Sequence, residues 1–222
     1  MKNTTVILLS TLACFILISS CCTDNSCTSS YIIEGFVTSA SGNTPCVGFE
    51  IELEEKVVEG GMLNSFFETA GIATTDAQGY YRIEFPRRSV VEFKIKVEKE
   101  GWFPFTKLID PELFLPDSPV ENNMQTTPRA DLDLRVINIP PTTEDDKMRV
   151  RLLKTFEQYS TCDAEWRVFF GENIDTTLSC IIPGDVWMPY LSIDQTDPEA
   201  EVTIIDSVYC PSFETTIINV LY

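Results

Sequence analysis

The sequence predicts an all-β protein: two antiparallel β-sandwich domains in tandem after a lipoprotein signal peptide. Three observations lead to this prediction. One apolar run lies near the N-terminus and ends at cysteines, segments after Tyr31 alternate apolar and polar residues, and Gly, Asn, Asp and Pro separate those segments. Because side chains in a strand point alternately to its two faces, each alternating segment is expected to be a half-buried strand.

The N-terminal segment has the features of a secretion signal. A short positive start, Met1-Lys2, precedes the apolar residues 6–18, which match the roughly 7 to 15 residues of a signal-peptide core. A membrane-spanning helix would need about 20 apolar residues. The following Ile18-Ser19-Ser20-Cys21 resembles the bacterial lipobox, in which the cysteine is acylated, for example with palmitate, and becomes the new N-terminus. A conventional cleavage that leaves Cys21 as a disulfide partner is the alternative.

The resemblance to a lipobox implies a membrane-anchored lipoprotein of the cell envelope, expected at the outer membrane of a Gram-negative bacterium. Residues 1–20 would be the signal peptide and residues 21–30 a polar, lipidated tether. Two or more acyl chains on one residue are enough for stable membrane attachment.

The charge of the chain limits its partners. It carries 16 Lys and Arg against 34 Asp and Glu, a formal net charge of -18. Such a surface repels phosphate backbones and anionic headgroups, so we expect no nucleic-acid partner. The lipid is expected to hold the protein at the membrane, and the remaining partner is an unidentified protein or glycan.

The chain has no histidine. Histidine is the commonest general base and metal ligand, so Ser-His-Asp, Cys-His and His-rich zinc sites are excluded. We therefore expect no catalytic residues, no metal and no cofactor, and favour a non-catalytic binding or structural adaptor. A carbohydrate-binding lipoprotein is the second hypothesis. A hydrolase with two carboxylates about 5 to 9.5 Å apart is the third, and residue spacing identifies no such pair.

Four segments are expected to form strands of the first sandwich. They are VGFEIELE, YYRIEF, VEFKIKVEK and DLDLRVI, separated by turn sequences such as ASGNTP and DAQG. Their expected inward residues are Val47, Phe49, Ile51 and Leu53; Tyr81, Ile83 and Phe85; Val91, Phe93, Ile95 and Val97; and Leu132, Leu134 and Val136.

A family resemblance appears in the same region. The stretches EGFVTSASGNTPCVGFEIEL, GIATTDAQGYYRIEFP and VEKEGWFPF carry a Gly-Pro hairpin, a T-T-D-x-x-G-x-Y turn and a later glycine-aromatic pair. This series resembles the carboxypeptidase-regulatory-like, transthyretin-like sandwich over residues 31–137. The resemblance implies a fold and no particular chemistry, because such domains serve as folding aids, spacers and binding modules. The arrangement of such a domain followed by a strand-rich half that ends in YCPSFETTIINVLY resembles small lipoproteins of Gram-negative bacteria.

Two segments depart from that pattern. Residues 54–67 contain Gly60-Gly61 and are expected to be an extended loop, and the proline-rich residues 110–129 are expected to be a surface excursion. The sequence NIPPTTEDD is the best domain boundary, because two prolines and an acidic run neither pair nor pack well. The predicted domains are residues 31–138 and 143–222.

The second domain is expected to be another sandwich, Ig-like in the broad sense. Its first element, residues 147–159, fits a strand or a helix, and we choose a strand because β-branched and aromatic segments follow. Those segments are WRVFFG, TLSCII, MPYLSI, EVTIID and TTIINVLY.

The cysteines can pair in this compartment. Cys27 and Cys46 are expected at opposite ends of a hairpin and should not bond. A disulfide between Cys162 and Cys180 is favoured in the second half, where Cys210 is a further candidate, and buried free thiols are the alternative.

Three surface features are candidates for binding. The first is a set of aromatic rings that could form a ligand platform. Such rings can stack on sugars, and the alternative is that they close the ends of the sandwiches. The acids Asp194, Asp197, Glu199 and Glu201 crowd one loop but lack the spacing of a calcium loop. The final strand, INVLY, could offer an edge for strand addition or pair within its own sheet. The candidate platform residues are Trp102, Phe105, Trp187 and Tyr190.

Overall fold

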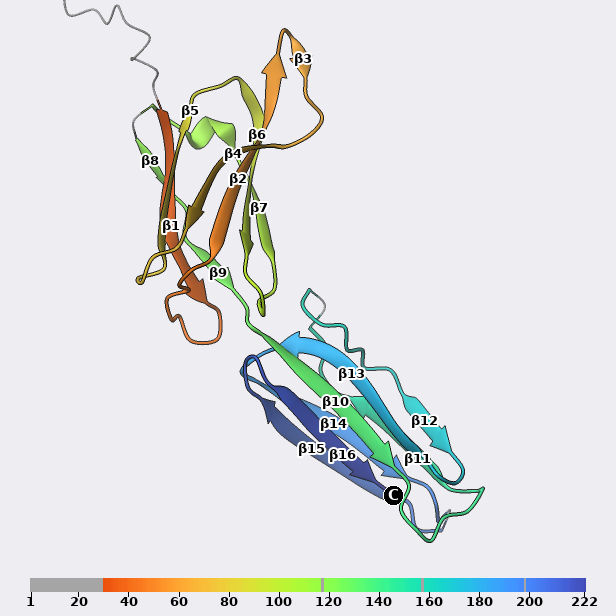
Figure 1. The fold of residues 1–222 in the computed structure, drawn as a ribbon. Helices are drawn as coiled ribbons and strands as arrows, with labels where there is room; N and C mark the ends of the chain where they lie inside the picture. Colours follow the sequence, from red (N-terminus) through yellow and green to blue (C-terminus); the bar gives the residue numbers. More distant parts are fainter. Residues whose placement is uncertain (1–29, 117, 157, 198) are drawn as a thin grey trace, which may run out of the picture.

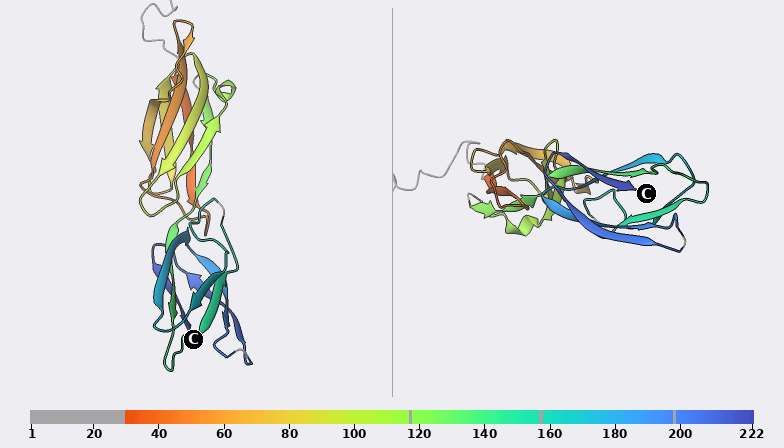
Figure 2. Two further views of the ribbon diagram at one scale, coloured as in Figure 1. Left: turned by 90° about the vertical axis from the view of Figure 1, so that its right-hand side faces the viewer. Right: turned by 90° about the horizontal axis from the view of Figure 1, so that it is seen from below.

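The computed structural model describes residues 30–116, 118–156, 158–197 and 199–222. They form two β-rich lobes placed end to end (Figures 1 and 2). The signal peptide, Cys21, Cys22 and Cys27 lie outside the described residues, so the lipidation prediction stays a prediction. Within the described part of the chain, no helix has the length and hydropathy needed to cross a membrane.

The first lobe is a sandwich of two sheets. One sheet contains β5 (Tyr80–Pro86), β1 (Ser30–Ser39), β8 (Pro119–Glu121) and β9 (Met124–Thr126). The other contains β4 (Glu68–Thr74), β2 (Glu50–Glu59), β6 (Val90–Glu98), β7 (Phe105–Ile109) and the short β3 (Met62–Leu63).

The second lobe is also a two-sheet sandwich. One sheet has the order β13 (Asp175–Pro183), β10 (Arg129–Ile137), β16 (Thr215–Leu221). The other has the order β12 (Arg167–Phe170), β11 (Lys147–Leu152), β14 (Val186–Asp194), β15 (Val202–Cys210). The prediction of two all-β sandwiches is therefore confirmed.

Both lobes have the same connectivity. In the first, β1 pairs antiparallel with β5 and parallel with β8 and β9, while the facing sheet runs β4-β2-β6-β7. In the second, β10 pairs antiparallel with β13 and parallel with β16, and the facing sheet runs β12-β11-β14-β15. Each strand of the second lobe thus has a positional counterpart in the first, β11 with β2 and β12 with β4. Strands β8 and β9 together correspond to β16, and β3 has no counterpart among the described strands.

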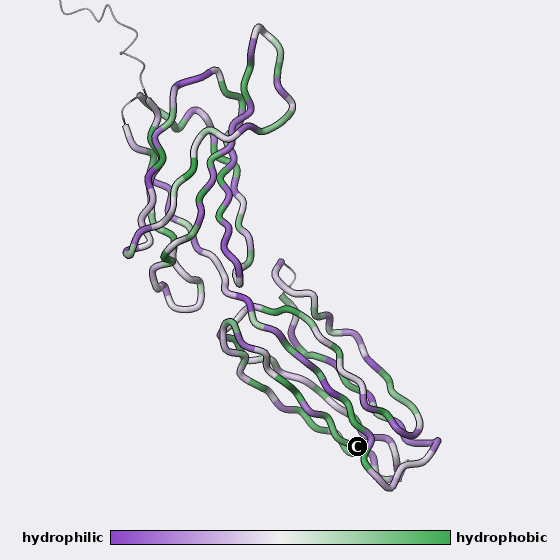
Figure 3. The backbone as a smooth tube through the Cα atoms, viewed as in Figure 1, coloured by the Kyte–Doolittle hydropathy of each residue, from purple (hydrophilic) through white to green (hydrophobic). Residues whose placement is uncertain are grey.

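The alternating segments bury the predicted faces with two exceptions. The buried residues include Phe49, Ile51, Leu53 and the predicted inward residues of β5. Figure 3 shows hydrophilic and hydrophobic residues alternating along the strands. Val47 is exposed because it precedes β2 in a turn, and Val91 is exposed because the register of β2 and β6 shifts between Lys56 and Val57.

One predicted domain boundary and one predicted surface segment are wrong. Strand β10, assigned to the first sandwich from its alternation, pairs with β13 and β16 and packs in the second core. The first sandwich therefore ends near Pro128 and not at Asn138. The predicted surface excursion contains a 3-10 turn (Pro111–Leu113), β8 and β9, and buries Phe114 and Met124 in the first core.

The remaining loop predictions also need correction. Around Gly60-Gly61 the chain forms a tight hairpin, because β2 continues to Glu59 and β3 pairs back onto it. The sequence NIPPTTEDD is a loop inside the second sandwich. Residues 147–152 form a strand, as predicted, with Met148, Val150 and Leu152 buried.

Backbone hydrogen bonds connect the two lobes near Arg129. The Arg129 amide donates to Gly101 O at 2.9 Å, and Arg129 O accepts from the Phe213 amide at 2.7 Å. The Gly184 amide donates to Pro128 O at 2.8 Å. These bonds join the turn at Gly101 in the first sandwich and the turns at Gly184 and Phe213 in the second to Pro128 and Arg129, where the chain passes from one sandwich to the other.

Candidate functional site

The outer surface of the sheet β12-β11-β14-β15 differs from the rest of this acidic chain. In β11, Met148, Val150 and Leu152 point inward, so Lys147, Arg149 and Arg151 point outward. Strand register then places the outward residues of the neighbouring strands in rows beside them. We call this surface the arginine face; it comprises Trp166, Val168, Phe170, Lys147, Arg149, Arg151, Trp187, Pro189, Leu191, Ile193, Thr203, Ile205, Ser207 and Tyr209.

Two rows define the centre of the arginine face. Val168, Arg149, Ile193 and Thr203 are successive cross-strand partners, and in the next row Arg151 pairs with Leu191 and Leu191 with Ile205. None of the outward positions of these four strands carries Asp or Glu. In a chain with 34 acids and 16 bases, this sheet surface is apolar and basic.

The basic side chains of β11 lie over aromatic rings. The guanidinium carbons of Arg149 and Arg151 lie 4.4 and 4.8 Å from the centre of the Trp166 ring, and Lys147 Nζ lies 5.5 Å from that of Phe170. Cation–π contact holds a guanidinium in place while leaving its N–H groups available to an acceptor.

These cations lack carboxylate partners within the described chain. The ion pairs of the second sandwich join Arg135 to Asp175 and Arg167 to Asp163. Arg151 Nε is buried without a hydrogen-bond partner among the described residues. Because a guanidinium offers donors in a planar fork that fits a carboxylate, Arg149 and Arg151 present an unfilled site for an anionic group.

The corresponding face of the first sandwich is built differently. On β2 and β6, Glu54 pairs with Lys94 and Lys96, and Lys96 Nζ also lies 3.6 Å from Glu52 Oε2. Burial raises the pKa of Glu54, and the two ammonium groups outweigh this effect and hold the pKa below its ordinary value. The charges of that face therefore satisfy one another, whereas those of the arginine face have no carboxylate partner among the described residues.

An exposed ring pair lies at the end of the arginine face nearest the first lobe. Trp187 is 60% exposed, and its ring centre lies 5.6 Å from that of its cross-strand partner Tyr209. The Tyr209 hydroxyl donates to Asp185 Oδ1 at 3.3 Å, and burial and Asp185 both raise the pKa of Tyr209. The phenol therefore stays protonated and holds its ring beside the indole.

The structure does not assemble the predicted platform. Of its four residues, only Trp187 lies on the arginine face. Trp102 packs against Phe49 and Phe213 at the junction of the lobes, and Phe105 packs against the first core. Tyr190 points inward and packs against the second core. Three of the four aromatic rings thus pack against the sandwich cores, which was the alternative to a ligand platform.

The acidic loop is organised by its own backbone. Asp194 accepts from the Thr196 amide and Asp197 from the Glu199 amide, both at 2.9 Å, and Glu201 accepts from Gln195 at 2.6 Å. Across the described residues, no three Cys, Asp or Glu side chains gather as a metal ion would require.

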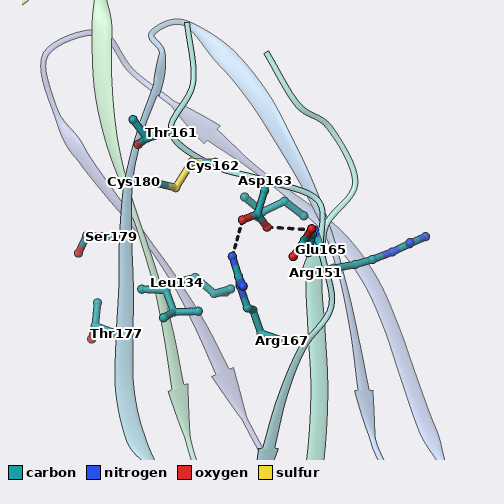
Figure 4. A pocket seen from close by; sticks show the side chains of 12 residues that line it. Leu134, Arg151, Thr161, Cys162, Asp163, Glu165, Arg167, Thr177, Ser179 and Cys180 are labelled. Atoms are coloured by element: carbon teal, nitrogen blue, oxygen red, sulfur yellow. Dashed lines mark hydrogen bonds and ion pairs between the residues drawn. A yellow bond between two sulfur atoms is a disulfide. The ribbon is translucent and has the colours of Figure 1, made fainter. Parts of the chain in front are cut away.

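The second sandwich also contains a cavity of about 360 Å³ between β13 and the segment before β12 (Figure 4). Asp163 forms an ion pair with Arg167 there and accepts from the Glu165 amide at 3.0 Å. Asp163 is thus paired with an arginine, and Glu165 also lines the cavity. This arrangement stabilises the segment before β12.

A disulfide between Cys162 and Cys180 borders this cavity, with Cα atoms 5.2 Å apart. This is the pair that strand positions favoured. Cys46 and Cys210 are free and buried, and burial raises the pKa of Cys46 to about 11, although Lys99 lowers it. Thiols of this kind are poor nucleophiles at neutral pH.

Sequence reasoning missed the arginine face. Its signal is the segment KMRVRLLK, in which the basic residues of the second half are concentrated and occupy the outward positions of β11. A single strand of this pattern is indistinguishable from an ordinary solvated strand. Only the register with β12 and β14 shows that its neighbours are apolar.

No protein-family model matches the sequence, and no curated protein matches it. Several solved structures resemble it in part. The Bacillus anthracis TIE protein is 9% identical, with a TM-score of 0.39, over 87% of this chain and 34% of that chain. A streptococcal ancillary pilin is 12% identical, with a TM-score of 0.35, over 87% of this chain and 62% of that chain.

Chlorocatechol 1,2-dioxygenase from Pseudomonas putida is 17% identical, with a TM-score of 0.34, over 46% of this chain and 62% of that chain. The chain therefore spans about a third of the length of the first protein and 62% of the other two.

Proposed function

We propose that this protein is a non-catalytic, lipid-anchored module of the cell envelope that binds a partner protein through the arginine face. The observation that carries the proposal is the contrast between two equivalent sheets of one chain. The face on β2 and β6 is filled by its own ion pairs, whereas the part of the chain that the structure describes offers no carboxylate to Arg149 and Arg151 on the arginine face.

The composition of the arginine face favours a protein partner. Arginine, tryptophan and tyrosine are the residues that contribute most to protein–protein binding, and acids are depleted from the centres of such interfaces. Ile205 and Phe170 are exposed on the same surface and add apolar area. A partner with carboxylates placed for the two guanidinium groups and with apolar residues between them would satisfy all of these groups.

The resemblance of residues 31–137 to carboxypeptidase-regulatory-like domains supports the proposal, because such domains serve as spacers and binding modules. In this arrangement the lipid on Cys21 attaches the chain to the membrane, and the first sandwich separates the arginine face from the tether. The second sandwich is then the part that meets the partner.

A glycan is the second candidate, and the Trp187–Tyr209 pair favours it. An exposed indole beside a phenol offers flat apolar surface with a polar edge, which suits the faces of sugar rings. Affinity electrophoresis on neutral and acidic polysaccharides tests this candidate. If a polysaccharide retards the unmodified protein but not Trp187→Ala, the partner is a glycan and not a protein.

Site-specific photocrosslinking in intact cells tests the main proposal. A photoreactive residue is placed at Val168, which is exposed on β12 opposite Arg149, or at Ile72, which is exposed on β4 opposite Glu52. The two positions are counterparts in the two sandwiches. We expect an adduct of one discrete mass at Val168, absent at Ile72 and lost when Arg149→Glu and Arg151→Glu are added. Equal adducts at both positions, or none at Val168, would contradict the proposal.

A further inference from the structure

Strand β15 is an edge strand with an unusual exposure pattern. It pairs with β14 over nine consecutive residue pairs without a register shift, and its other edge has no partner strand among the described residues. Val202 and Ile204 belong to the inward face and are still 53% and 49% exposed, while Ile205 on the arginine face is 70% exposed. Apolar side chains are therefore uncovered on both sides of one edge.

Three other edges of the molecule carry protective features. The β13 edge is covered, because the Thr161 amide donates to Ile181 O at 3.0 Å and the Ile181 amide to Thr161 Oγ1 at 2.8 Å. Strand β5 has alternating charges and ends at Pro86, and β12 is only four residues long. Short strands, charges, proline and covering segments are the usual means of preventing edge pairing.

Strand β15 has one of these features, the carboxylate of Asp206, which belongs to the inward face and accepts a hydrogen bond from the Ser207 amide at 2.7 Å. The strand contains no other charged residue and no proline. Strand β16 also ends its sheet, but it buries Ile218 and Val220 on one side and exposes apolar residues on the other side alone. A globular partner could cover one face of β15. Only a strand hydrogen-bonded along the edge covers both faces and also satisfies the backbone.

The residues of β15 are self-complementary about Ile205. In an antiparallel pair of two β15 strands with Ile205 opposite itself, Val202 lies opposite Val208, and Thr203 opposite Ser207. Apolar residues then meet apolar residues, and hydroxyl groups meet hydroxyl groups. The exception is Asp206, which lies opposite Ile204. The two Asp206 carboxylates are therefore not directly opposed to each other, and direct opposition of like charges would be destabilising.

We propose that β15 is the contact between two copies of this protein, which join edge to edge with Ile205 on the two-fold axis. The result is one continuous sheet across two sandwiches, with the two arginine faces side by side. Isologous two-fold contacts are the commonest form of association. Edge pairing buries less than the roughly 1,600 Å² of a standard interface, so the contact is weak in solution and concentration-dependent.

Cysteine crosslinking of the full-length chain tests both the contact and its register. Ile205→Cys should form an intermolecular disulfide on mild oxidation, because directly opposite Cα atoms are about 4.5 to 5.5 Å apart. Thr203→Cys should not crosslink to itself, because the two positions are about 13 Å apart at four residues' offset. Thr203→Cys combined with Ser207→Cys should crosslink. Ile217→Cys on β16 and the unmodified chain report the background.

Sedimentation velocity over a hundredfold range of protein concentration provides the second readout. The unmodified chain should show a rising dimer fraction, and Ile205→Lys should reduce that fraction at least tenfold by placing two ammonium groups on the axis. Ile205 is exposed, so folding is retained. Background-level crosslinking at Ile205→Cys, or a monomer at every concentration, would overturn the proposal. Thr203, Ile205 and Ser207 belong to the arginine face, but both experiments use the chain alone, so their outcome does not depend on the partner of that face.

Discussion

The rings of Trp102 and Phe213 meet across the junction of the two sandwiches, with centroids 5.4 Å apart. Trp102 belongs to the first sandwich, where it also packs edge-on against buried Phe49 at 4.9 Å. Phe213 is exposed at a turn of the second sandwich and lies against Gly101. One indole therefore closes a core and joins the two lobes.

The two rings should differ in their effects on stability. Trp102→Ala is expected to lower the free energy of unfolding of the first sandwich by about 2 kcal/mol, because it removes a large, partly buried side chain that packs against the first core. Phe213→Ala should leave each sandwich stable and separate their unfolding into two transitions. Differential scanning calorimetry of the two variants measures both effects, and identical thermograms would contradict this account of the junction.

Acid should destabilise the second sandwich through Asp146. Hydrogen bonds from the Thr143 hydroxyl, the Asn138 amide and the Thr143 backbone hold the pKa of this carboxylate below its ordinary value. Because the folded pKa is the lower one, the stabilisation is present above the unfolded value of about 3.9 and is lost as pH falls through the folded pKa. Urea titrations between pH 7 and pH 2 should show this loss, and Asp146→Asn should reduce the slope.

Reduction of the Cys162–Cys180 disulfide should also weaken the second sandwich. The bond closes a loop of sequence separation 18, for which the chain-entropy relation gives about 3 kcal/mol of stabilisation. The double variant Cys162→Ala with Cys180→Ala should lose that amount in chemical denaturation under non-reducing conditions. An unchanged midpoint would show that the segment before β12 is held by other contacts, including the Asp163–Arg167 ion pair.

Two glycines with positive φ should respond differently to alanine. Gly79 has φ of 76°, and a Cβ there would lie 2.6 Å from Val37 O, whereas Gly60 has φ of 58° with open space around it. Gly60→Ala should therefore cost only the roughly 1 to 2 kcal/mol of the left-handed conformation. Gly79→Ala should cost clearly more, because the backbone of β1 must also move. Equal unfolding free energies would refute the steric part of this prediction.

The sequence predicts which face of a strand is buried better than it predicts the strands with which that strand pairs. Alternation correctly identified the buried sides of β2, β5 and β6 because one side of each strand meets the core. The same alternation in DLDLRVI could not show which core receives Leu132 and Leu134, since the pattern fixes the face of a strand and not its sheet. The prolines of residues 110–129 suggested a loop, but Pro119 begins the parallel strand β8, where its missing N–H is tolerated.

The candidate site was beyond sequence reasoning for the same reason. Trp187 was selected as an aromatic residue, but its relation to Arg149 and Arg151 depends on strand register across β11 and β14. Trp166 precedes a short strand, and nothing in its local sequence indicates that two guanidinium groups stack on it. Pairing between strands, which is non-local, creates the arginine face.

The central claim is that the arginine face lacks acids because a partner supplies them, and the unfolding free energy of Val168→Glu tests it most directly. The new carboxylate would lie opposite Arg149 on an exposed position. The account predicts that stability stays unchanged or rises by about 0.5 kcal/mol, while the matched Ile72→Glu, opposite Glu52, is destabilised. A loss of more than about 2 kcal/mol in Val168→Glu, the size of a core defect, would show that the apolar face serves folding and contradict the claim.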